Sequence, residues 1–438
     1  MATEITSDEM KNIGIALDTQ DDFNENCDDR IIKIRDKAID LSNRAKNVSS
    51  DDLNRAQGVI QKHIESLQKE WPALFGAVPD KLYVHIDLDS FYASVETLKR
   101  PEYKDIPLGV GSMLMLATSN YPARAFGVRA GMPGYMAKKL CPTLVITPCN
   151  FDLYNDYSDK VMAILSTYNP QIEIYGIDEA CLVFDDTKLR EAYEIYNNNA
   201  IVGRIMDEEP LIYHEFGFDA LSKLVDKIRG AVFRNTRLTV SAGISVCRGL
   251  AKYSCGLNKP NGMFMIRDDF DSHISHLLVD KINGIGKATK EMLFRAFNIT
   301  TVSELRSKIN LIHLLYPTKT FLNLFRLSYG LSIFDSTKTK FNAQDKSIGK
   351  SMSFKPTTNY KTINDILWVL CISISKKLKY KLKFATIITV TYKYSNFKSY
   401  TRRSKTNTVD SEIEIFNLCV EILKETFGGE KENCNFLF

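Results

Sequence analysis

The chain has 438 residues, of which 44% are hydrophobic and 25% charged, and 57 Lys+Arg against 53 Asp+Glu give a formal net charge of +4. This length exceeds one hydrophobic core and predicts about two to four domains. No run of about 18 uncharged apolar residues occurs, and the start, MATEITSDEM, has no basic or apolar leader segment, so the sequence argues against membrane insertion and secretion and favours an intracellular protein.

The nine cysteines stand singly, without a CxxC pair, and the six histidines form no HExxH motif. This pattern argues against a zinc finger and against a secreted disulfide scaffold. We expect most of the cysteines to be buried thiols.

The N-terminal region changes character near residue 30. Residues 1–28 are acidic and poor in aromatic side chains, so we expect them to be disordered. RIIKIRDKAIDLSNRAK and SSDDLNRAQGVIQKHIESLQKE then predict two helices, the second with a Ser-Asp N-cap. These helices form an appendage in front of the first predicted strand.

The next part of the chain alternates strands and helices. The strand in KLYVHIDLDSF leads into the helix ASVETLKR, which stops before Pro101, and residues 107–150 mix short strands with glycine-rich turns and one helix. A helix at about 151–167, the strand pair IEIYGIDEA and CLVF, the helix FDALSKLVDKIRGAVFRNT and the strand LTVSAGIS follow. Alternation of this kind predicts an α/β or α+β layer with antiparallel neighbours.

Residues 268–335 predict a wholly helical block. Residues 346–438 predict a strand, a helix at about 362–380, two strands and a helix at about 410–426, after a polar linker at 336–347. This last block carries 16 Lys+Arg against 8 Asp+Glu, whereas residues 1–80 carry 10 against 16. A basic C-terminal module suggests nucleic acid as a partner, although a solvated lysine-rich surface explains the same charge.

Two acidic motifs end apolar runs. In YVHIDLDSFYASVE, Asp87 and Asp89 share one face of a regular strand, and in YGIDEA, Asp178 and Glu179 close a second run. Adjacent strands would bring these carboxylates to one sheet edge, where Mg²⁺, which prefers oxygen ligands, would offset their mutual repulsion. DxD alone is weak evidence, because a solvated strand terminus has the same pattern.

Basic and glycine-rich segments offer phosphate contacts. SNYPARAFGVRAGMPG contains Tyr121, Arg124 and Arg129, and LAKYSCGLNKPNG contains Lys252 and Lys259, although each cation could be an ordinary surface residue. INGIGKATKEML has the Gly-x-Gly turn of a helix-hairpin-helix, which presents backbone N–H groups to DNA phosphate, but an αα-hairpin with a glycine cap fits equally well.

Together these motifs resemble one known family. DLDSFYASVE, GVGSMLMLATSNYPARAFGVRAGMPGYMAKKLCP, IDEA, SAGIS, LAKYSCGLNKPNG and INGIGK occur in the order found in Y-family translesion DNA polymerases. The GSMLMLATSNYPAR stretch and the helical appendage look most like the kappa (DinB-related) branch. The resemblance covers about residues 30–430.

The resemblance implies an α+β multidomain fold, a right-hand polymerase with a palm containing a mixed antiparallel sheet, fingers, a helical thumb, a C-terminal α/β little finger and an N-terminal helical clasp. The implied ranges are clasp 29–80, palm 81–89 and 151–267, fingers 90–150, thumb with the helix-hairpin-helix 268–337 and little finger 346–438. The little finger looks incomplete, since NCNFLF stands about where its final strand should begin.

The resemblance also implies roles for single residues. Asp87, Asp178 and Glu179 would be catalytic and would ligate two Mg²⁺ ions, for which Mn²⁺ could substitute, with the Leu88 carbonyl as a further ligand; Asp89 is not a main ligand in the family. Tyr92 would be the steric gate that excludes ribonucleotides, although Phe91 and Tyr92 could also be plain core aromatics. The nucleotide-binding set would be Ser90, Phe91, Tyr92, Tyr121, Arg124 and Lys259, and the DNA-binding set Gly284, Gly286, Lys287, Lys350, Arg402 and Arg403.

The implied function is low-fidelity, template-directed DNA synthesis opposite damaged templates, by a nuclear monomer that binds primer-template DNA and dNTPs. A sliding clamp is a further candidate partner, although no clamp motif is visible. Some positions depart from the family: Gly176 and Ile177 replace a usual Ser-Leu, Cys181 replaces a tyrosine, and SMSFKPTTNY lacks an expected arginine. The alternatives are a catalytically silent DNA-binding scaffold of the same fold and a sister enzyme such as a deoxycytidyl transferase.

Overall fold

The computed structural model describes residues 24–201, 211–332, 335, 347–352, 354, 357–394, 398–427 and 436–437. The chain divides into a larger unit, Lys37–Phe341, and a smaller one, Met1–Asp36 with Asn342–Phe438. The linker expected at 336–347 and most of the segment expected to be disordered lie outside the described residues, but helix α2 begins at Asn24, ahead of the expected residue 29.

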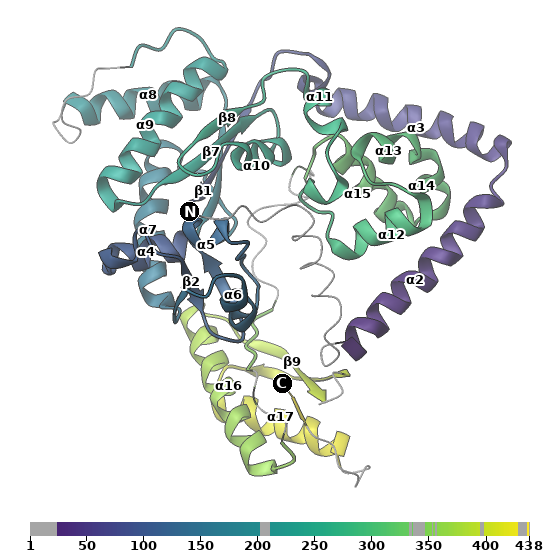
Figure 1. The fold of residues 1–438 in the computed structure, drawn as a ribbon, viewed down its shortest axis with the longest axis vertical. Helices are drawn as coiled ribbons and strands as arrows, with labels where there is room; N and C mark the ends of the chain where they lie inside the picture. The colour runs from purple at the N-terminus through teal and green to yellow at the C-terminus, as the bar shows by residue number, and fades with distance from the viewer. Residues whose placement is uncertain are drawn as a thin grey trace. The chain divides into compact units, whose positions relative to one another are not determined.

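Five strands of the larger unit form one sheet (Figure 1). Its order is β5 (Glu173–Ile174), β6 (Glu179–Phe184), β1 (Leu82–Leu88), β7 (Val240–Ser245) and β8 (Met263–Met265). All neighbours are antiparallel except β7 and β8, which are parallel. Because β1 is central, each of its residues is buried except Asp87, which lies near its end.

Helices cover this sheet. The helices around this sheet are α4 (Phe91–Lys99), α7 (Phe151–Tyr168), α8 (Asp186–Ile201), α9 (Phe218–Thr236) and α10 (Arg248–Leu257). Both α9 and α10 pack on β7, and α10 also contacts β1. α10 approaches very closely at Gly243, where an added Cβ would lie 2.1 Å from the Ala251 carbonyl oxygen. The sequence at this point therefore needs glycine for packing.

Residues 101–147 contain a second, smaller sheet, ordered β3 (Leu116–Ser119), β2 (Leu108–Gly111) and β4 (Val145–Thr147). It carries the short helices η2 (Pro101–Tyr103), α5 (Tyr121–Ala125) and α6 (Gly134–Leu140). The side chain of Asn120 caps α5 by accepting from Ala123 N–H and also accepts from Leu108 N–H at 2.9 Å, so it fixes α5 against β2.

The rest of the larger unit is helical. A cluster of short helices comprises α11 (Phe270–Ser275), η3 (Val279–Lys281), α12 (Lys287–Phe297), α13 (Val302–Ser307), α14 (Ile309–Leu315) and α15 (Thr318–Ser328). Helix α3 (Ser50–Glu70), which follows α2 (Asn24–Lys46) and precedes η1 (Pro72–Phe75), packs against α14 (Figure 1). Its contacts include Asn310 donating to Gln57 at 2.5 Å and a two-bond pair between Arg326 and Glu70.

The smaller unit contains a three-stranded antiparallel sheet of order β10 (Ser399–Val409), β9 (Ala385–Tyr394) and β11 (Phe436–Leu437). Helices α16 (Tyr360–Tyr380) and α17 (Glu412–Phe427) pack against each other, and α17 packs on β9. Buried residues of both helices and of β9 form one core, with Ile388 and Val390 contributed by the strand. The opposite face of β9 exposes Ile387, Thr389 and Thr391.

Three local expectations were wrong. The hairpin in IEIYGIDEACLVF turns at residues 175–178, so Asp178 lies in the turn and Glu179 begins a strand instead of ending one. Helix α8 was missed, because its residues include the polar run NNN, which is unfavourable in a helix. Among the described residues of 347–359 no strand precedes α16, and the third strand of that sheet is β11.

Candidate active site

The acidic motifs meet on adjacent strands. β1 runs antiparallel to β6, so the end of one lies beside the beginning of the other, and Asp87 is paired with Glu179. Asp178 is joined to the same edge through its carbonyl oxygen, which accepts from Leu88 N–H at 2.9 Å. The predicted meeting of the two strands at one sheet edge is therefore confirmed.

Two lysines reach these carboxylates. Lys259 Nζ donates to Asp87 Oδ1, and Lys252 Nζ donates to Glu179 Oε2 at 2.5 Å. His85 Nε2 lies 3.8 Å from the same Glu179 oxygen, its ring is stacked on Tyr175 with centroids 5.9 Å apart, and neither ring nitrogen has a hydrogen-bond partner among the described residues. The site thus brings together three acidic side chains, two cations and a buried imidazole.

The electrostatics distinguish the three carboxyl groups. Burial, together with the neighbouring Glu179 and Asp178 charges, raises the pKa of Asp87 to about 6 despite the Lys259 contact. Burial and the Glu179 charge also raise the pKa of Asp178. Burial would raise the pKa of Glu179 as well, but the hydrogen bond and charge of Lys252 lower it below its ordinary value. Burial lowers the pKa of His85 to about 3, so the imidazole is neutral.

Asp89 has a different role from its neighbour Asp87. Its side chain is buried, with Oδ1 accepting from Ser241 Oγ at 2.7 Å and Oδ2 accepting from Asn261 N–H at 2.8 Å. Both oxygens thus have protein donors, which tie the end of β1 to β7 and to the NKPNG loop. Asp89 fixes the loop that carries Lys259 beside Asp87.

The donor set fits a hard divalent cation. One ligand atom each from His85, Asp87 and Glu179 lies within 4.8 Å of the others, and Asp178 adds a third carboxylate from the adjoining turn. Clustered carboxylates with raised pKa values gain most from a bound cation, because it offsets their repulsion. Carboxylate oxygens are the ligands that Mg²⁺ and Mn²⁺ prefer.

The predicted nucleotide contacts flank this cluster. Ser90 has φ +43° and begins α4, so the N–H groups of Ser90 and Phe91 lie at the N-terminus of a helix, where anions bind favourably. Tyr121 has a buried hydroxyl without a hydrogen-bond partner in the described part of the chain, and Asp89, Lys259 and Asp87 influence its ionisation. Arg124 stacks over the Tyr121 ring, 4.8 Å from the ring centroid, and donates to the Ser119 carbonyl.

Phe91 and Tyr92 belong to an aromatic group at the start of α4. Phe91 is buried, whereas Tyr92 is half-buried and stacks on Tyr154 with centroids 4.5 Å apart and planes inclined by 12°. Phe151 contacts the Tyr92 ring edge-on at 5.7 Å, and Tyr154 donates its hydroxyl to Glu96 at 2.7 Å. Tyr92 is therefore packed against residues of α7, which the motif analysis had not identified.

The residues predicted to contact DNA lie outside the carboxylate cluster, three of them around the start of α12 in the larger unit and three in the smaller unit. Gly284, with φ +118°, forms the turn before α12, while Gly286 is the N-cap of α12 and Lys287 its first residue. In the smaller unit, Lys350 is exposed before α16, and β10 carries Arg402 and Arg403 as consecutive residues. Arg403 pairs with the exposed Thr389 and Arg402 with the buried Val390, so the two arginines belong to opposite faces of the sheet.

Some residues of the site escaped the sequence analysis. Lys252 was only one of several candidate phosphate contacts, and nothing indicated that it pairs with Glu179. One sequence feature could have identified His85: it lies two residues before Asp87 on a predicted strand, so both side chains are expected on the same face of the sheet. Arg248, four residues before Lys252, gave none, because its partners Glu173 and Asp335 are distant in sequence.

Comparison with known proteins identifies relatives of this chain. Residues 86–256 match the impB/mucB/samB family model, and residues 345–436 match the model of that family's C-terminal domain. The chain is 32% identical to DNA polymerase kappa of Arabidopsis thaliana over 84% of this chain and 50% of the relative, and 32% identical to the Homo sapiens polymerase kappa over 91% and 51%. It thus spans about half the length of these relatives.

Bacterial relatives are matched over more of their length. DNA polymerase IV of Ureaplasma parvum is 30% identical over 78% of this chain and 89% of the relative. A solved Y-family DNA polymerase chimera shares the fold with a TM-score of 0.64 and 24% identity, over 81% of this chain and 96% of the chimera, which confirms the predicted fold class. The chain belongs to the Y family of DNA polymerases, in the group that includes polymerase kappa and polymerase IV.

Proposed function

We propose that this chain is a template-directed DNA polymerase that adds dNTPs to a primer 3′ end opposite damaged DNA, with low fidelity. The pairing of Asp87 with Glu179 carries this proposal, because it assembles three carboxylates beside Lys259 and the unpartnered Tyr121 hydroxyl. The relatives named DNA polymerase kappa and IV support the same activity.

The reaction would be an in-line nucleotidyl transfer. The primer 3′-oxygen attacks the α-phosphorus of the dNTP, a new P–O bond forms, and the bond to the β-phosphate oxygen breaks, with release of pyrophosphate. Asp87, Asp178, Glu179 and the Leu88 carbonyl would hold two Mg²⁺ ions, or Mn²⁺ in their place. When bound, these ions supply charge stabilisation to the attacking and leaving oxygens.

The protein would bind the triphosphate through groups already near the metal site. Lys259 would exchange Asp87 for phosphate oxygens, and the N–H groups of Ser90 and Phe91 would contact the phosphates at the α4 N-terminus. The Tyr121 hydroxyl would gain the hydrogen bond it lacks, and Arg124 would supply a second cation. Because these donors are positioned before substrate arrives, they cost little reorganisation.

The ring of Tyr92 would lie under the sugar of the bound nucleotide. Its stack on Tyr154 and its edge contact with Phe151 would support the ring in this position. A 2′-hydroxyl would then collide with a fixed aromatic surface, so dNTPs are accepted and NTPs are rejected. Tyr92 is the specificity residue for the sugar.

Primer-template DNA would be bound through its backbone. The Gly284–Gly286 turn and Lys287 offer N–H groups and one charge at the start of α12, and the open face of β9 and β10 offers Arg403 and Lys405. Lys350 adds an exposed cation, whereas Arg402 lies on the helix-bearing side of that sheet. Such contacts position the duplex without reading its sequence.

The cellular setting follows from the relatives. The relatives named DNA polymerase kappa are eukaryotic, which supports action in the nucleus, whereas DNA polymerase IV is a bacterial relative. A monomeric state and a sliding clamp as a further partner stay predictions from the sequence. No helix in the described residues is long and apolar enough to cross a membrane.

Primer extension with Mg²⁺ tests the activity. Wild type should extend a primer on undamaged, abasic and N²-guanine-adducted templates, whereas Asp178→Ala should bind the same DNA but fail to extend it. A wild type that binds DNA without extension would point to a silent scaffold, and insertion of dCMP opposite every template base would point to a deoxycytidyl transferase.

A further inference from the structure

One face of helix α10 contacts the two strands that flank the turn carrying Asp178. Arg248 donates to Glu173 of β5 through Nε at 2.7 Å, with a second bond from its terminal nitrogen at 2.5 Å, and Lys252 donates to Glu179 of β6 at 2.5 Å. Residues four apart share a helix face, so these two contacts are one turn apart. The hairpin is therefore held on β5, at Glu173, and at the first residue of β6, Glu179, by the same helix.

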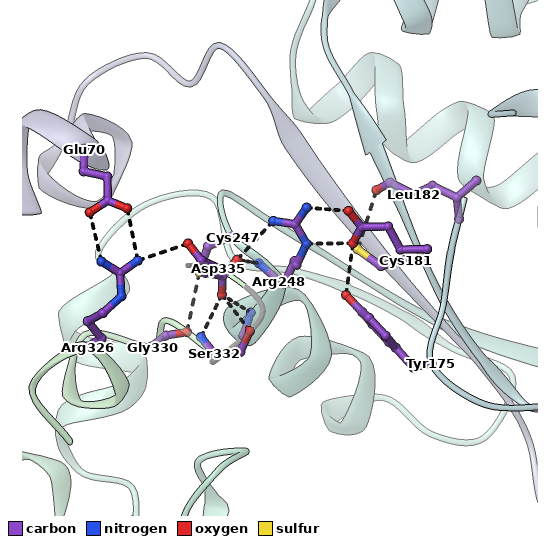
Figure 2. A network of polar contacts seen from close by, with 12 residues as sticks. Glu70, Tyr175, Cys181, Leu182, Cys247, Arg248, Arg326, Gly330, Ser332 and Asp335 are labelled. Atoms are coloured by element: carbon purple, nitrogen blue, oxygen red, sulfur yellow. Dashed lines mark hydrogen bonds and ion pairs between the residues drawn. The ribbon is translucent and has the colours of Figure 1, made fainter. Parts of the chain in front are cut away.

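Helix α10 is itself anchored at its N-terminus (Figure 2). The Asp335 carboxylate is fully buried and accepts from Arg248 N–H at 2.9 Å and Gly249 N–H at 3.1 Å. It also accepts from the N–H and hydroxyl of Ser332, at 2.7 and 2.9 Å. A carboxylate at a helix N-terminus satisfies N–H groups that have no partner within the helix.

The helix also has no space to move against the sheet. A Cβ at Gly243 of β7 would lie 2.1 Å from the Ala251 carbonyl oxygen, and one at Gly249 would lie 2.1 Å from the Gly330 carbonyl oxygen. The Arg248 guanidinium further lies over the Tyr83 ring of β1, 4.8 Å from its centroid. α10 is therefore fixed at both its sheet-facing side and its N-terminus.

The network continues beyond α10. Arg326 of α15 donates to the Asp335 carbonyl oxygen at 3.0 Å and binds both Glu70 oxygens at 2.9 and 3.2 Å (Figure 2). Residues from α3, α15, α10 and β5 thus form one continuous chain of polar contacts, which ends at the turn of the metal site.

We propose that Arg248 and Lys252 are positioning residues of the metal site, which hold the 175–178 turn so that Asp178 and Glu179 present their oxygens to the metal ions. The inference rests on the proposed polymerase function and deepens it. Lys252 donates to Glu179 Oε2, so it orients this carboxylate and leaves its other oxygen for metal. Partners of this kind orient metal ligands, and their loss typically costs about 10- to 100-fold in metal affinity or activity.

The test uses the full chain and two readouts. Mn²⁺ binding is measured by electron paramagnetic resonance without DNA or nucleotide, and kcat and the dNTP KM are measured by primer extension. Arg248→Met and Lys252→Met should each weaken Mn²⁺ binding and lower kcat by about tenfold or more, with a much smaller change in dNTP KM. Lys252→Arg should recover most of the loss, because it keeps the positive donor.

Matched controls come from the same unit. Arg190 of α8 pairs with Asp186 at 3.0 Å and lies over the Tyr213 ring at 4.5 Å, and Lys160 of α7 pairs with Asp156 at 2.7 Å. Both pairs are exposed and involve no residue placed in the site. Arg190→Met and Lys160→Met should leave Mn²⁺ affinity and kcat within about twofold of wild type. If Arg248→Met fails to fold, Glu173→Gln replaces it, since the amide keeps the shape and weakens the pair.

The outcomes separate the two proposals. The positioning role would be overturned if the substituted proteins fold and keep wild-type Mn²⁺ affinity and kcat; these proteins are Lys252→Met and either Arg248→Met or Glu173→Gln. The polymerase proposal would be overturned instead if the wild-type protein never extends primers. Tighter Mn²⁺ binding by Lys252→Met would also overturn the positioning role, because it would show that the lysine competes with the metal ion for Glu179.

Discussion

The ring of Tyr92 lies nearly parallel to the ring of Tyr154, with the centroids 4.5 Å apart and 12° between the planes. Tyr154 is fully buried and its hydroxyl is bonded to the buried Glu96, so the ring beneath Tyr92 has a fixed position. Rejection of a single hydroxyl group requires an aromatic ring with a fixed position, because a displacement of about 1 Å would make room for the 2′-hydroxyl of a ribonucleotide.

Tyr92→Ala should raise ribonucleotide incorporation relative to dNTP incorporation by about 10- to 200-fold, the range expected when steric rejection worth about 1–3 kcal/mol is lost. The ratio of kcat/KM for an NTP to kcat/KM for the dNTP with the same base measures this sugar selectivity. Unchanged selectivity would refute the gate assignment. Tyr92→Phe is the control, since it keeps the ring and should keep the selectivity.

Gly243→Ala should destabilise the protein by about 1–3 kcal/mol or more, because the new Cβ would meet backbone atoms of α10 at 2.1 and 2.2 Å. Displacement of α10 should also lower primer extension. Denaturant unfolding measures the change in stability.

Gly256→Ala provides the comparison for that experiment. It lies on α10 with nothing within 4 Å of the added Cβ, so it should be neutral or stabilise by up to about 1 kcal/mol through helix propensity. Equal effects of the two substitutions would contradict the close contact between β7 and α10.

Glu304→Gln should reduce thermal stability at neutral pH but not at strongly acidic pH. Glu304 closes the capping box of α13 and accepts from the N–H groups of Thr300 and Thr301 and from the Thr300 hydroxyl, which lowers its pKa from 4.5 to about 2. A carboxyl group whose pKa is lower in the folded than in the unfolded protein stabilises the fold at pH values above its unfolded pKa of 4.5. This stabilisation is lost as the pH falls towards 2.

The measurement is the difference in Tm between wild type and Glu304→Gln at several pH values. The difference should be constant above about pH 6 and shrink between pH 4.5 and about 2. A difference that does not change with pH would show that the ionised form contributes nothing.

Arg403→Ala should weaken DNA binding and reduce the slope of log affinity against log salt concentration by about 1, as expected for one lost phosphate contact. Arg402→Ala should change both quantities less, because Arg402 belongs to the helix-bearing face of the sheet. Fluorescence anisotropy over a salt series measures both variants. Equal losses of DNA affinity in Arg403→Ala and Arg402→Ala would indicate that the DNA contacts the edge of β10 instead of the open face of the sheet.

Local patterns were sufficient for most individual elements. The strands β1, β2, β3, β4 and β7 and the helices α3, α7 and α9 follow from alternating or helical hydrophobic spacing and from caps such as Ser49 on α3. The patterns failed at Tyr175–Asp178, where an apolar run hides a turn, and at α8, where three asparagines mask a helix whose buried Leu189, Tyr193 and Tyr196 form a core-facing stripe. In both places tertiary packing outweighed local propensity.

The sequence by itself determined the family, because the order of DLDSFYASVE, NYPAR, IDEA and NKPNG is specific to one family, and it predicted which residues carry the chemistry. Only the tertiary structure decided what those residues contact. It pairs Asp87 with Glu179, bonds Asp89 to Ser241 and Asn261, and places Arg248 and Lys252 against the two strands that flank one turn. These relationships join residues up to 172 positions apart, as in the contact of Asp89 with Asn261, and arise from strand register and helix packing, which no local spacing records.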